Sequence, residues 1–365
     1  MFEGLAVTQP EIAQQLLDLV QKDSFPSASL FFGPLMSGRM YAATQTGKAL
    51  GVAKENTIIV SDRNHSYRIQ TALALLKRAK NKTAKDFLKD NVGILLQQYH
   101  GALIEDQSAA GKKKFEDAAT VGELLDMIGP AEESQIDGLV DKISKAVSPL
   151  MDSNKTSAIS VGQVRAIRDW CATSSMDGQR KLVIIEGLEN ALGSAVNALL
   201  KTLEEPPRDT FFVIISANPG RLLATILSRV RKFKFNALGE SQTKYIFNSL
   251  FVDPSKYSSL QQFFLEGAGI NDKFLLQAAE DLVVKRNLEV PALVKELENN
   301  KAWDLFYSHV LDLLYAGQKA GSIDAKRAEY LIEELTSMLN KAKTYNQLKR
   351  LTFDYVVYRV KEVLR

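Results

Sequence analysis

The sequence has few residues of the kinds that form disulfides or bind metals. Its 365 residues include one cysteine, Cys171, and three histidines, His65, His100 and His309, which are far apart along the chain. A lone cysteine cannot form an internal disulfide, and no cysteines and histidines have the short spacing of a zinc site. We therefore expect a protein of a reducing compartment without a structural metal.

A surplus of charge is also missing, because 46 Lys and Arg are balanced by 43 Asp and Glu to give a net charge of +3. A protein that binds DNA with its whole surface carries a much larger basic excess. Any contact with nucleic acid should therefore be local or shared with partners. The sequence also lacks the apolar run of about 18 residues that a membrane span needs, and its first residues lack the pattern of an export signal. We expect a soluble, cytoplasmic protein with no membrane contact.

Hydrophobic residues are abundant, at 45% of the chain, and a chain of this length is expected to form two or three domains. Short runs that are apolar throughout predict strands buried on both faces, as in a parallel sheet between helices. These runs occupy residues 29–32, 57–60, 182–185 and 211–216. The segments between them include predicted helices at 11–23, 39–50, 161–174 and 190–205. The predicted fold class is α/β.

Two long segments lack strand signals. Between residues 63 and 148 the apolar spacing is helical, and the piece SAAGKKKFEDAAT (108–120) within it is expected to be an exposed connection. Its lysines, Lys112–Lys114, are more simply explained as a solvated face than as a phosphate contact. From residue 240 to 365 the spacing is again helical, which predicts an all-helical C-terminal third.

A glycine-bracketed loop follows the first predicted strand. A phosphate-binding loop has the spacing G-x-x-x-x-G-K-[ST], in which amides hold phosphate, the lysine reaches the outer phosphates and the hydroxyl holds Mg²⁺. Residues 33–40, GPLMSGRM, keep both glycines, Gly33 and Gly38, but have Arg39 and Met40 in the last two places. Arginine can still pair with phosphate, whereas a thioether is a poor ligand for Mg²⁺. The pattern predicts a loop that has lost its metal ligand.

The second element of such a nucleotide site is an apolar strand that ends in two acids, one for Mg²⁺ and one that orients the attacking water. Residues 182–189, LVIIEGLE, offer Glu186 in the first place and Gly187 in the second. Glu186 is one methylene longer than aspartate and can still serve, but glycine has no side chain with which to polarise water. Two separate losses in one site favour a relic over a working ATPase.

A more specific pattern occupies residues 181–233. They read KLVIIEGLENALGSAVNALLKTLEEPPRDTFFVIISANPGRLLATILSRVRKF: a strand, an acidic turn, N-A-L-L-K-x-L-E-E-P-P, a second strand, N-P and T-I-L-S-R. This order resembles the AAA+ clamp-loader family, and within it the delta prime subunits of bacterial DNA polymerase III. The preceding SVGQVRAIRDW (160–170) resembles the helix of the I-x-x-D-Q-I-R type in that family, and the rest of residues 1–236 is covered more loosely.

The resemblance implies a domain organisation. Residues 1–236 would form a RecA-like α/β domain of the AAA+ P-loop type, with the helical insertion at about 63–148. A small helical lid would follow at 237–290, and a helical oligomerisation domain, the collar, at 291–365. Many delta prime relatives carry a four-cysteine zinc module after the position of Val60, and this chain has no such cysteines.

The resemblance also implies a role for Arg229. In the family's T-I-L-S-R-C element, the arginine is a finger that reaches into the ATP site of the neighbouring subunit. Here the element is T-I-L-S-R-V, with Val230 in place of cysteine. A guanidinium is always charged and contacts phosphate through two N–H groups, which suits this role. The alternative is a salt-bridged arginine on a surface turn.

Further residues correspond to a degenerate nucleotide site. The polar residue that the family calls sensor one is either Ser216 or Asn218, and the two stay open. Residues 269–273, GINDK, resemble a lid element of the family, which implies that Lys273 stands where an arginine contacts the phosphates. The alternative is an exposed helix start. The candidate site as a whole consists of Gly33, Gly38, Arg39, Glu186, Asn218 and Lys273.

The function implied by the resemblance is that of a clamp-loader subunit of DNA polymerase III, which helps to place the sliding clamp on primed DNA during replication. The partners would be gamma/tau and delta-type subunits, the sliding clamp and, through the complex, primed DNA. No cofactor or metal is required, and residual binding of ATP or ADP stays open. No ATPase or polymerase chemistry of its own is expected, although the chain would be a component of a DNA-directed DNA polymerase holoenzyme.

Two other interpretations have different consequences. An ATP-hydrolysing subunit of the gamma/tau type would use Arg39 and Glu186 as substitutes, and Met40 and Gly187 argue against it. A DNA-binding adaptor of another AAA+ machine would bind DNA tightly by itself, and the near-neutral charge argues against it.

Overall fold

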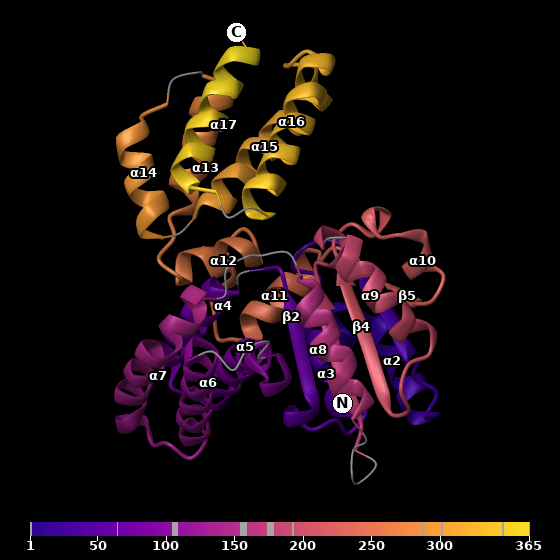
Figure 1. Cartoon of the computed structure of the whole chain (residues 1–365). Helices are drawn as coiled ribbons and strands as arrows, with labels where there is room; N and C mark the ends of the chain where they lie inside the picture. The colour runs from indigo at the N-terminus through magenta and orange to yellow at the C-terminus, as the bar shows by residue number, and fades with distance from the viewer. Residues whose placement is uncertain are drawn as a thin grey trace. The chain divides into compact units, whose positions relative to one another are not determined.

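The computed structural model describes residues 2–63, 65–103, 109–153, 159–173, 179–191, 193–285, 288–300, 302–344 and 347–364 (Figure 1). The chain divides into two compact units, Met1–Phe264 and Leu265–Arg365. The sequence predicts different boundaries, at residues 236 and 290, which separate an α/β domain, a lid and a collar. These boundaries stay predictions.

The first unit is built on a parallel sheet of five strands in the order β2-β3-β4-β1-β5. The sequence predicts four of them, namely β1 (Ala28–Phe32), β2 (Thr57–Ser61), β3 (Lys181–Glu186) and β4 (Thr210–Ser216). Both faces of these strands are covered, as their apolar runs require. The sequence does not predict the edge strand β5 (Arg231–Lys234), because three of its four residues are charged. The α/β prediction is confirmed.

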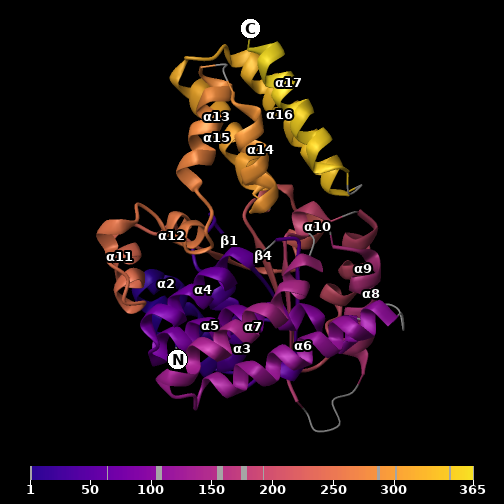
Figure 2. The ribbon, with the colours of Figure 1, turned by 90° about the vertical axis from the view of Figure 1, so that its left-hand side faces the viewer.

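Helices cover the two faces of the sheet. α2 (Pro10–Gln21) and α3 (Arg39–Ala49) share a hydrophobic core with one face. α8 (Val161–Ala172) and α9 (Gly193–Glu204) share a second core with the other. Figure 2 shows the two pairs on opposite sides of the strands. The carboxyl ends of the parallel strands meet at one edge of the sheet, which is where sites lie in other open α/β sheets.

The segment between β2 and β3 is helical, as predicted. It contains α4 (Ser66–Ala79), α5 (Lys82–Leu96), α6 (Ala109–Ile128) and α7 (Glu133–Ser153). The expectation of a connection at 108–120 is wrong, since α6 begins at Ala109 and continues through that piece. Lys112–Lys114 lie exposed near its start, and the polar residues conceal the helix because its buried stripe begins only at Ala118.

This helical bundle shares its core with the segment that follows β5. α11 (Glu240–Ser249) and the start of α12 (Leu260–Gly267) contribute Phe247, Phe263 and Phe264. Phe263 packs edge-on against Phe247, with ring centroids 5.6 Å apart. The insertion and the beginning of the predicted lid are therefore packed as one body.

Short elements connect these parts. α1 (Glu3–Thr8) precedes α2, and α10 (Ala224–Leu227) precedes β5. Single turns of 3₁₀ helix lie at Lys54–Asn56, Gln97–Tyr99, Gly101–Leu103, Leu188–Asn190, Pro219–Arg221 and Pro254–Lys256.

The second unit consists of helices and connections in its described residues, as predicted. Its helices after α12 are α13 (Asp272–Val283), α14 (Val290–Asn299), α15 (Trp303–Ala320), α16 (Ala325–Thr344) and α17 (Lys349–Val363). Phe306 and Phe353 meet in its core, with ring centroids 5.7 Å apart. Within the described ranges, no helix combines the length and the apolarity that crossing a bilayer would need.

Candidate functional site

The loop of residues 33–38 joins the carboxyl end of β1 to α3. Gly33 lies against the backbone of Phe235, so that a β-carbon on Gly33 would be 2.3 Å from the Phe235 carbonyl oxygen. Gly38 forms the N-cap of α3 with a φ of +88°, a left-handed conformation that favours glycine. The local backbone therefore explains why glycine occupies both positions of the predicted loop.

Arg39, in the place of the expected lysine, is buried at the start of α3, where only 6% of the residue is exposed. Burial, together with repulsion from Arg63, lowers the pKa of its guanidinium to about 10. Its Nη1 and the hydroxyl of Ser37 are both buried and have no hydrogen-bond partner among the described residues. The loop thus has unpaired donors, but they are enclosed within the chain.

Met40, in the place of the metal-binding hydroxyl, belongs to the core between the sheet and the helices α2 and α3. Only 5% of this residue is exposed. Its thioether accepts hydrogen bonds weakly, and Mg²⁺ requires oxygen ligands. This position now serves packing.

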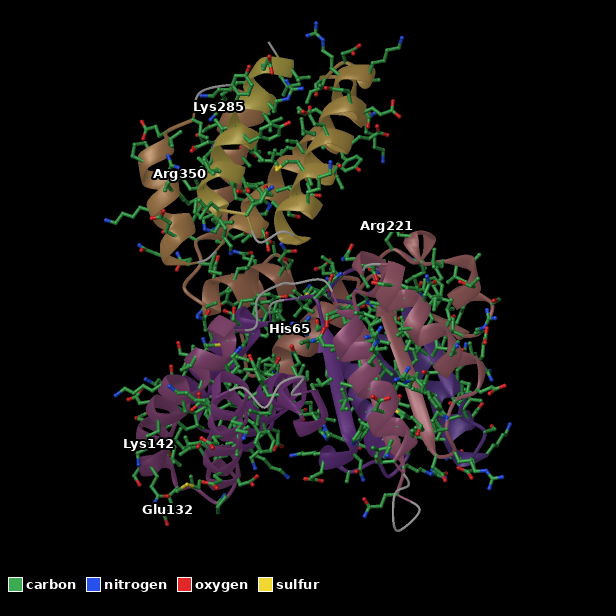
Figure 3. All side chains as sticks on the ribbon, in the orientation of Figure 1. His65, Glu132, Lys142, Arg221, Lys285 and Arg350 are labelled. Carbon is green, nitrogen blue, oxygen red and sulfur yellow. The ribbon has the colours of Figure 1, made fainter. Side chains whose placement is uncertain are left out.

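Glu186 ends β3, and its carboxylate is held by groups that follow β2. Oε2 accepts a hydrogen bond from Ser61 Oγ at 2.7 Å and lies 2.8 Å from His65 Nε2, while Oε1 is 3.6 Å from Arg63 Nε. Figure 3 labels His65. Burial by itself would raise the pKa of this carboxyl, but the contacts with His65, Arg63 and Ser61 outweigh it and hold the pKa below the usual range. The carboxylate is charged and already satisfied from within the chain.

Gly187 follows directly, with a φ of +86°. A β-carbon on this residue would lie 1.8 Å from Asp62 Oδ1, so the Asp62 carboxylate fills the space of a side chain at position 187. Asn190 donates a hydrogen bond to Asp62 Oδ2 at 2.6 Å, whereas Oδ1 is buried without a partner among the described residues. Burial raises the pKa of the Asp62 carboxyl.

The two candidates for sensor one lie at the end of β4. Ser216 is buried, and its hydroxyl accepts a hydrogen bond from the backbone N–H of Asn218 at 3.1 Å. The Asn218 side chain is exposed. Lys273 belongs to the second compact unit, where it lies exposed in the first turn of α13.

Arg229 lies just after α10, on the surface beside the end of α9. Its Nη1 donates hydrogen bonds to the Thr225 carbonyl oxygen at 2.7 Å and to Ser228 Oγ at 3.3 Å. Its Nη2 forms an ion pair with the carboxylate of Glu204, the last residue of α9. In the isolated chain the candidate finger is thus a paired arginine on a surface turn.

Comparisons with known proteins point to one family. A protein-family model described as DNA polymerase III, delta subunit, matches residues 128–239. The delta' subunit of DNA polymerase III from Bacillus subtilis is 37% identical over 81 residues, which are 22% of this chain and 25% of the relative. This chain is related to the clamp-loader subunits of DNA polymerase III. The family model spans the run from which the resemblance was inferred, and that inference is confirmed.

The clamp-loader relatives are of more than one kind. The tau subunit of Bacillus subtilis is 25% identical over 201 residues, which are 54% of this chain and 34% of the relative. A solved structure of a DNA polymerase III gamma subunit-related protein from Thermotoga maritima is 14% identical with a TM-score of 0.43, over 96% of this chain and 100% of that chain. The chain matches about a quarter to a third of the length of these curated relatives.

The residues present do not fit a nucleotide complex with Mg²⁺. Met40 offers no oxygen ligand and is buried in the core. Glu186 is engaged by Ser61 and His65, so that a metal-bound water would have to displace them. No step of catalysis is therefore assigned to the chain's own loop.

The sequence analysis missed the polar residues after β2. Asp62, Arg63 and His65 all contact or adjoin the end of β3. The signal was available, because they follow a predicted strand directly, and the carboxyl ends of parallel strands meet at one edge of a sheet. A register was needed to place them, and β2 and β3 pair Ser61 with Glu186.

Proposed function

We propose that this protein is a non-hydrolysing subunit of a DNA polymerase III clamp loader, of the delta prime type, and that it supplies Arg229 to the ATP site of a neighbouring subunit. Within the complex it would help to load the sliding clamp onto primed DNA. The carrying observation is a contrast between two parts of one chain. The phosphate loop has lost its lysine and its metal ligand, and the turn after β3 has lost the second acid, whereas the T-I-L-S-R element is intact.

The state of the chain's own nucleotide site supports this proposal. The positions that lost their groups now serve the fold, since Met40 fills the core and the Asp62 carboxylate fills the space at Gly187. Residual binding of ATP or ADP would rely on Gly33, Gly38 and Arg39, with Asn218 and Lys273 as further candidates. No cofactor is required for the proposed role.

The anchoring of Arg229 supports the other half of the proposal. Ile226 and Val230, which flank the finger, are buried in the same core as α9. The backbone is therefore fixed, while 31% of the Arg229 side chain is exposed. An arginine that acts across a subunit interface needs a rigid base and a side chain at the surface.

The remaining parts take roles from the same proposal. Residues 237–290 would be the lid and residues 291–365 the collar through which the subunit joins the others. The partners would be gamma/tau and delta-type subunits, the sliding clamp and, through the complex, primed DNA. The protein would work in the cytoplasm as a part of the polymerase holoenzyme.

The test is the ATPase rate of the complex reconstituted with its partner subunits, in the presence of the clamp and primed DNA. We expect the isolated chain to be inactive and Arg229→Ala to lower the rate of the complex by about tenfold or more, as for the loss of a finger. Arg221→Ala is the matched control, because Arg221 is exposed in the same connection between β4 and β5 and has no ion pair in the described part of the chain (Figure 3). ATP turnover by the isolated chain, or full activity of the Arg229→Ala complex, would contradict the proposal.

A gamma/tau-like ATPase is the second candidate, because the match to a tau subunit covers 54% of this chain. It predicts ATP turnover that depends on Arg39 and Glu186. The burial of Arg39 and Met40 and the internal contacts of Glu186 weigh against it.

A further inference from the structure

We infer that Glu204 is a positioning residue for Arg229, which holds the guanidinium in a retracted position until ATP in the neighbouring subunit displaces the carboxylate. The inference rests on the proposed function and deepens it, because it gives the finger a control element within the same chain. Glu204 belongs to the L-E-E-P-P run and Arg229 to the T-I-L-S-R run, so the contact also connects two parts of the signature.

Both ends of the guanidinium are engaged inside the chain. Nη1 donates to the Thr225 carbonyl oxygen at 2.7 Å, and Nη2 forms the ion pair with Glu204. A guanidinium grips a phosphate through two N–H groups side by side. Because Nη1 and Nη2 are both engaged, the edge between these two nitrogens becomes available to a phosphate only after Arg229 releases an internal partner.

The placement of Glu204 has no benefit for the helix that carries it. Glu204 is the last residue of α9, where the backbone carbonyls carry partial negative charge, and an acid there destabilises the helix. Its neighbour Glu205 is also exposed but forms no ion pair in the described part of the chain. Of the two adjacent acids, Glu204 is therefore the one used by Arg229.

The contact can break without any change in the fold. Leu203 of α9 and Ile226 and Val230 around the finger belong to one buried core, which fixes the backbone on both sides of the pair. The side chains themselves lie at the surface, with 31% of Arg229 and 45% of Glu204 exposed. Rotation about side-chain bonds is sufficient to free the arginine.

The strength of such a pair suits a displaceable contact. Ion pairs between partly exposed side chains shift an equilibrium by up to about fivefold. A phosphate carries more negative charge than one carboxylate, and its attraction grows where a subunit interface excludes water. Glu204 can thus bias Arg229 away from the interface and still yield to bound nucleotide.

The test is the ATP dependence of the ATPase rate of the reconstituted complex, with the clamp and primed DNA present. We expect Glu204→Gln to lower the ATP concentration at half-maximal rate by about two- to fivefold, with a smaller change in the maximal rate. Glu204→Asp, which keeps the charge, should restore the ATP dependence toward wild type, and Glu205→Gln is the control for a change of charge at this surface. In the Arg229→Ala background, Glu204→Gln should have no further effect, because its partner is gone.

The outcomes separate the inference from the function on which it rests. A fully active Arg229→Ala complex overturns the proposed function itself. If Arg229→Ala is defective but Glu204→Gln behaves like wild type or like Glu205→Gln, the inference alone is overturned. The same holds if Glu204→Gln shifts the ATP dependence equally with and without Arg229. Unfolding curves of the purified variants verify that each is folded.

Discussion

The carboxylate of Asp62 occupies the space in which a side chain at position 187 would begin. A β-carbon on Gly187 would lie 1.8 Å from Asp62 Oδ1. The cause is the pairing of β2 with β3, in which Ser61 stands opposite Glu186, so that the next two residues lie side by side. The second acid of a working site cannot be restored here by one substitution, because another acid already fills the place.

Gly187→Ala should therefore destabilise the first unit. The φ of +86° is strained for alanine, and the methyl group overlaps Asp62. Gly38→Ala is the matched control, since its φ is +88° but no atom of the described residues lies within 4 Å of an added β-carbon. Urea titrations should show a loss of about 1–2 kcal/mol for Gly38→Ala, and a larger loss for Gly187→Ala that Asp62→Ala reduces. If Gly187→Ala and Gly38→Ala lose the same free energy of unfolding, the Asp62 side chain moves aside at no measurable cost.

Glu186→Gln should lower the free energy of unfolding by about 3 kcal/mol near pH 7, because it removes a buried charge that His65 and Arg63 contact. The pKa of Glu186 lies below its ordinary value of 4.5 in the folded chain, so the unfolded chain binds the proton first as the pH falls. The stability due to the carboxylate is thus present above that ordinary value and declines below it. The difference between the urea midpoints of the two proteins should therefore shrink steadily as the pH falls below about 4.5. A constant difference would contradict the internal contacts of Glu186.

Cys171 should be inert in the folded protein. Burial raises the pKa of its thiol to about 12, and the thiolate is the reactive species. Since the chain has one cysteine, an aromatic disulfide reagent reports on this residue alone. We expect its reaction near pH 8 to be at least about 100-fold slower in the native chain than in urea. Rapid labelling without denaturant would show that the core around α8 opens readily.

In the second unit, Arg359→Lys should lower the stability, although it keeps the positive charge. Arg359 donates Nε and Nη2 to the two carboxylate oxygens of Glu334 at 2.8 and 2.7 Å, and lysine cannot form this fork. We expect a loss of about 1 kcal/mol in the free energy of unfolding. Asp354→Asn, which removes the exposed pair of Asp354 with Arg350, is the control and should cost no more than about 0.5 kcal/mol. If the two variants lose the same free energy of unfolding, the two-pronged contact of Arg359 with Glu334 is no stronger than an exposed ion pair.

The strands were predictable where burial dictates composition. β1 to β4 are apolar because both faces of the sheet are covered, and each occupies the predicted run within one or two residues. β5 has three charged residues out of four, because an edge strand that buries only Phe233 needs no apolar run. The start of α6 was missed for a related reason, since Lys112–Lys114 lie before its buried stripe.

The candidate site was predictable only where the residues are close in sequence. The loop at 33–40 and the turn after β3 carry their own patterns. The contacts of Glu186 with His65 and of Arg229 with Glu204 join residues that are distant along the chain, and they depend on strand register and helix packing. The spacing of residues along the sequence gives neither the strand register nor the helix packing.

The shared core of the helical insertion has a consequence for any shorter form of this protein. Phe247, Phe263 and Phe264 are covered by α4 to α7, and Thr71 donates a hydrogen bond to the Phe264 carbonyl oxygen at 2.6 Å. The insertion is thus not a cassette that can be excised between β2 and β3. Its removal would expose the rings of Phe247, Phe263 and Phe264 to water, far beyond the insertion along the chain. A shorter homologue would have to lose the helices and exchange the phenylalanines for polar residues together.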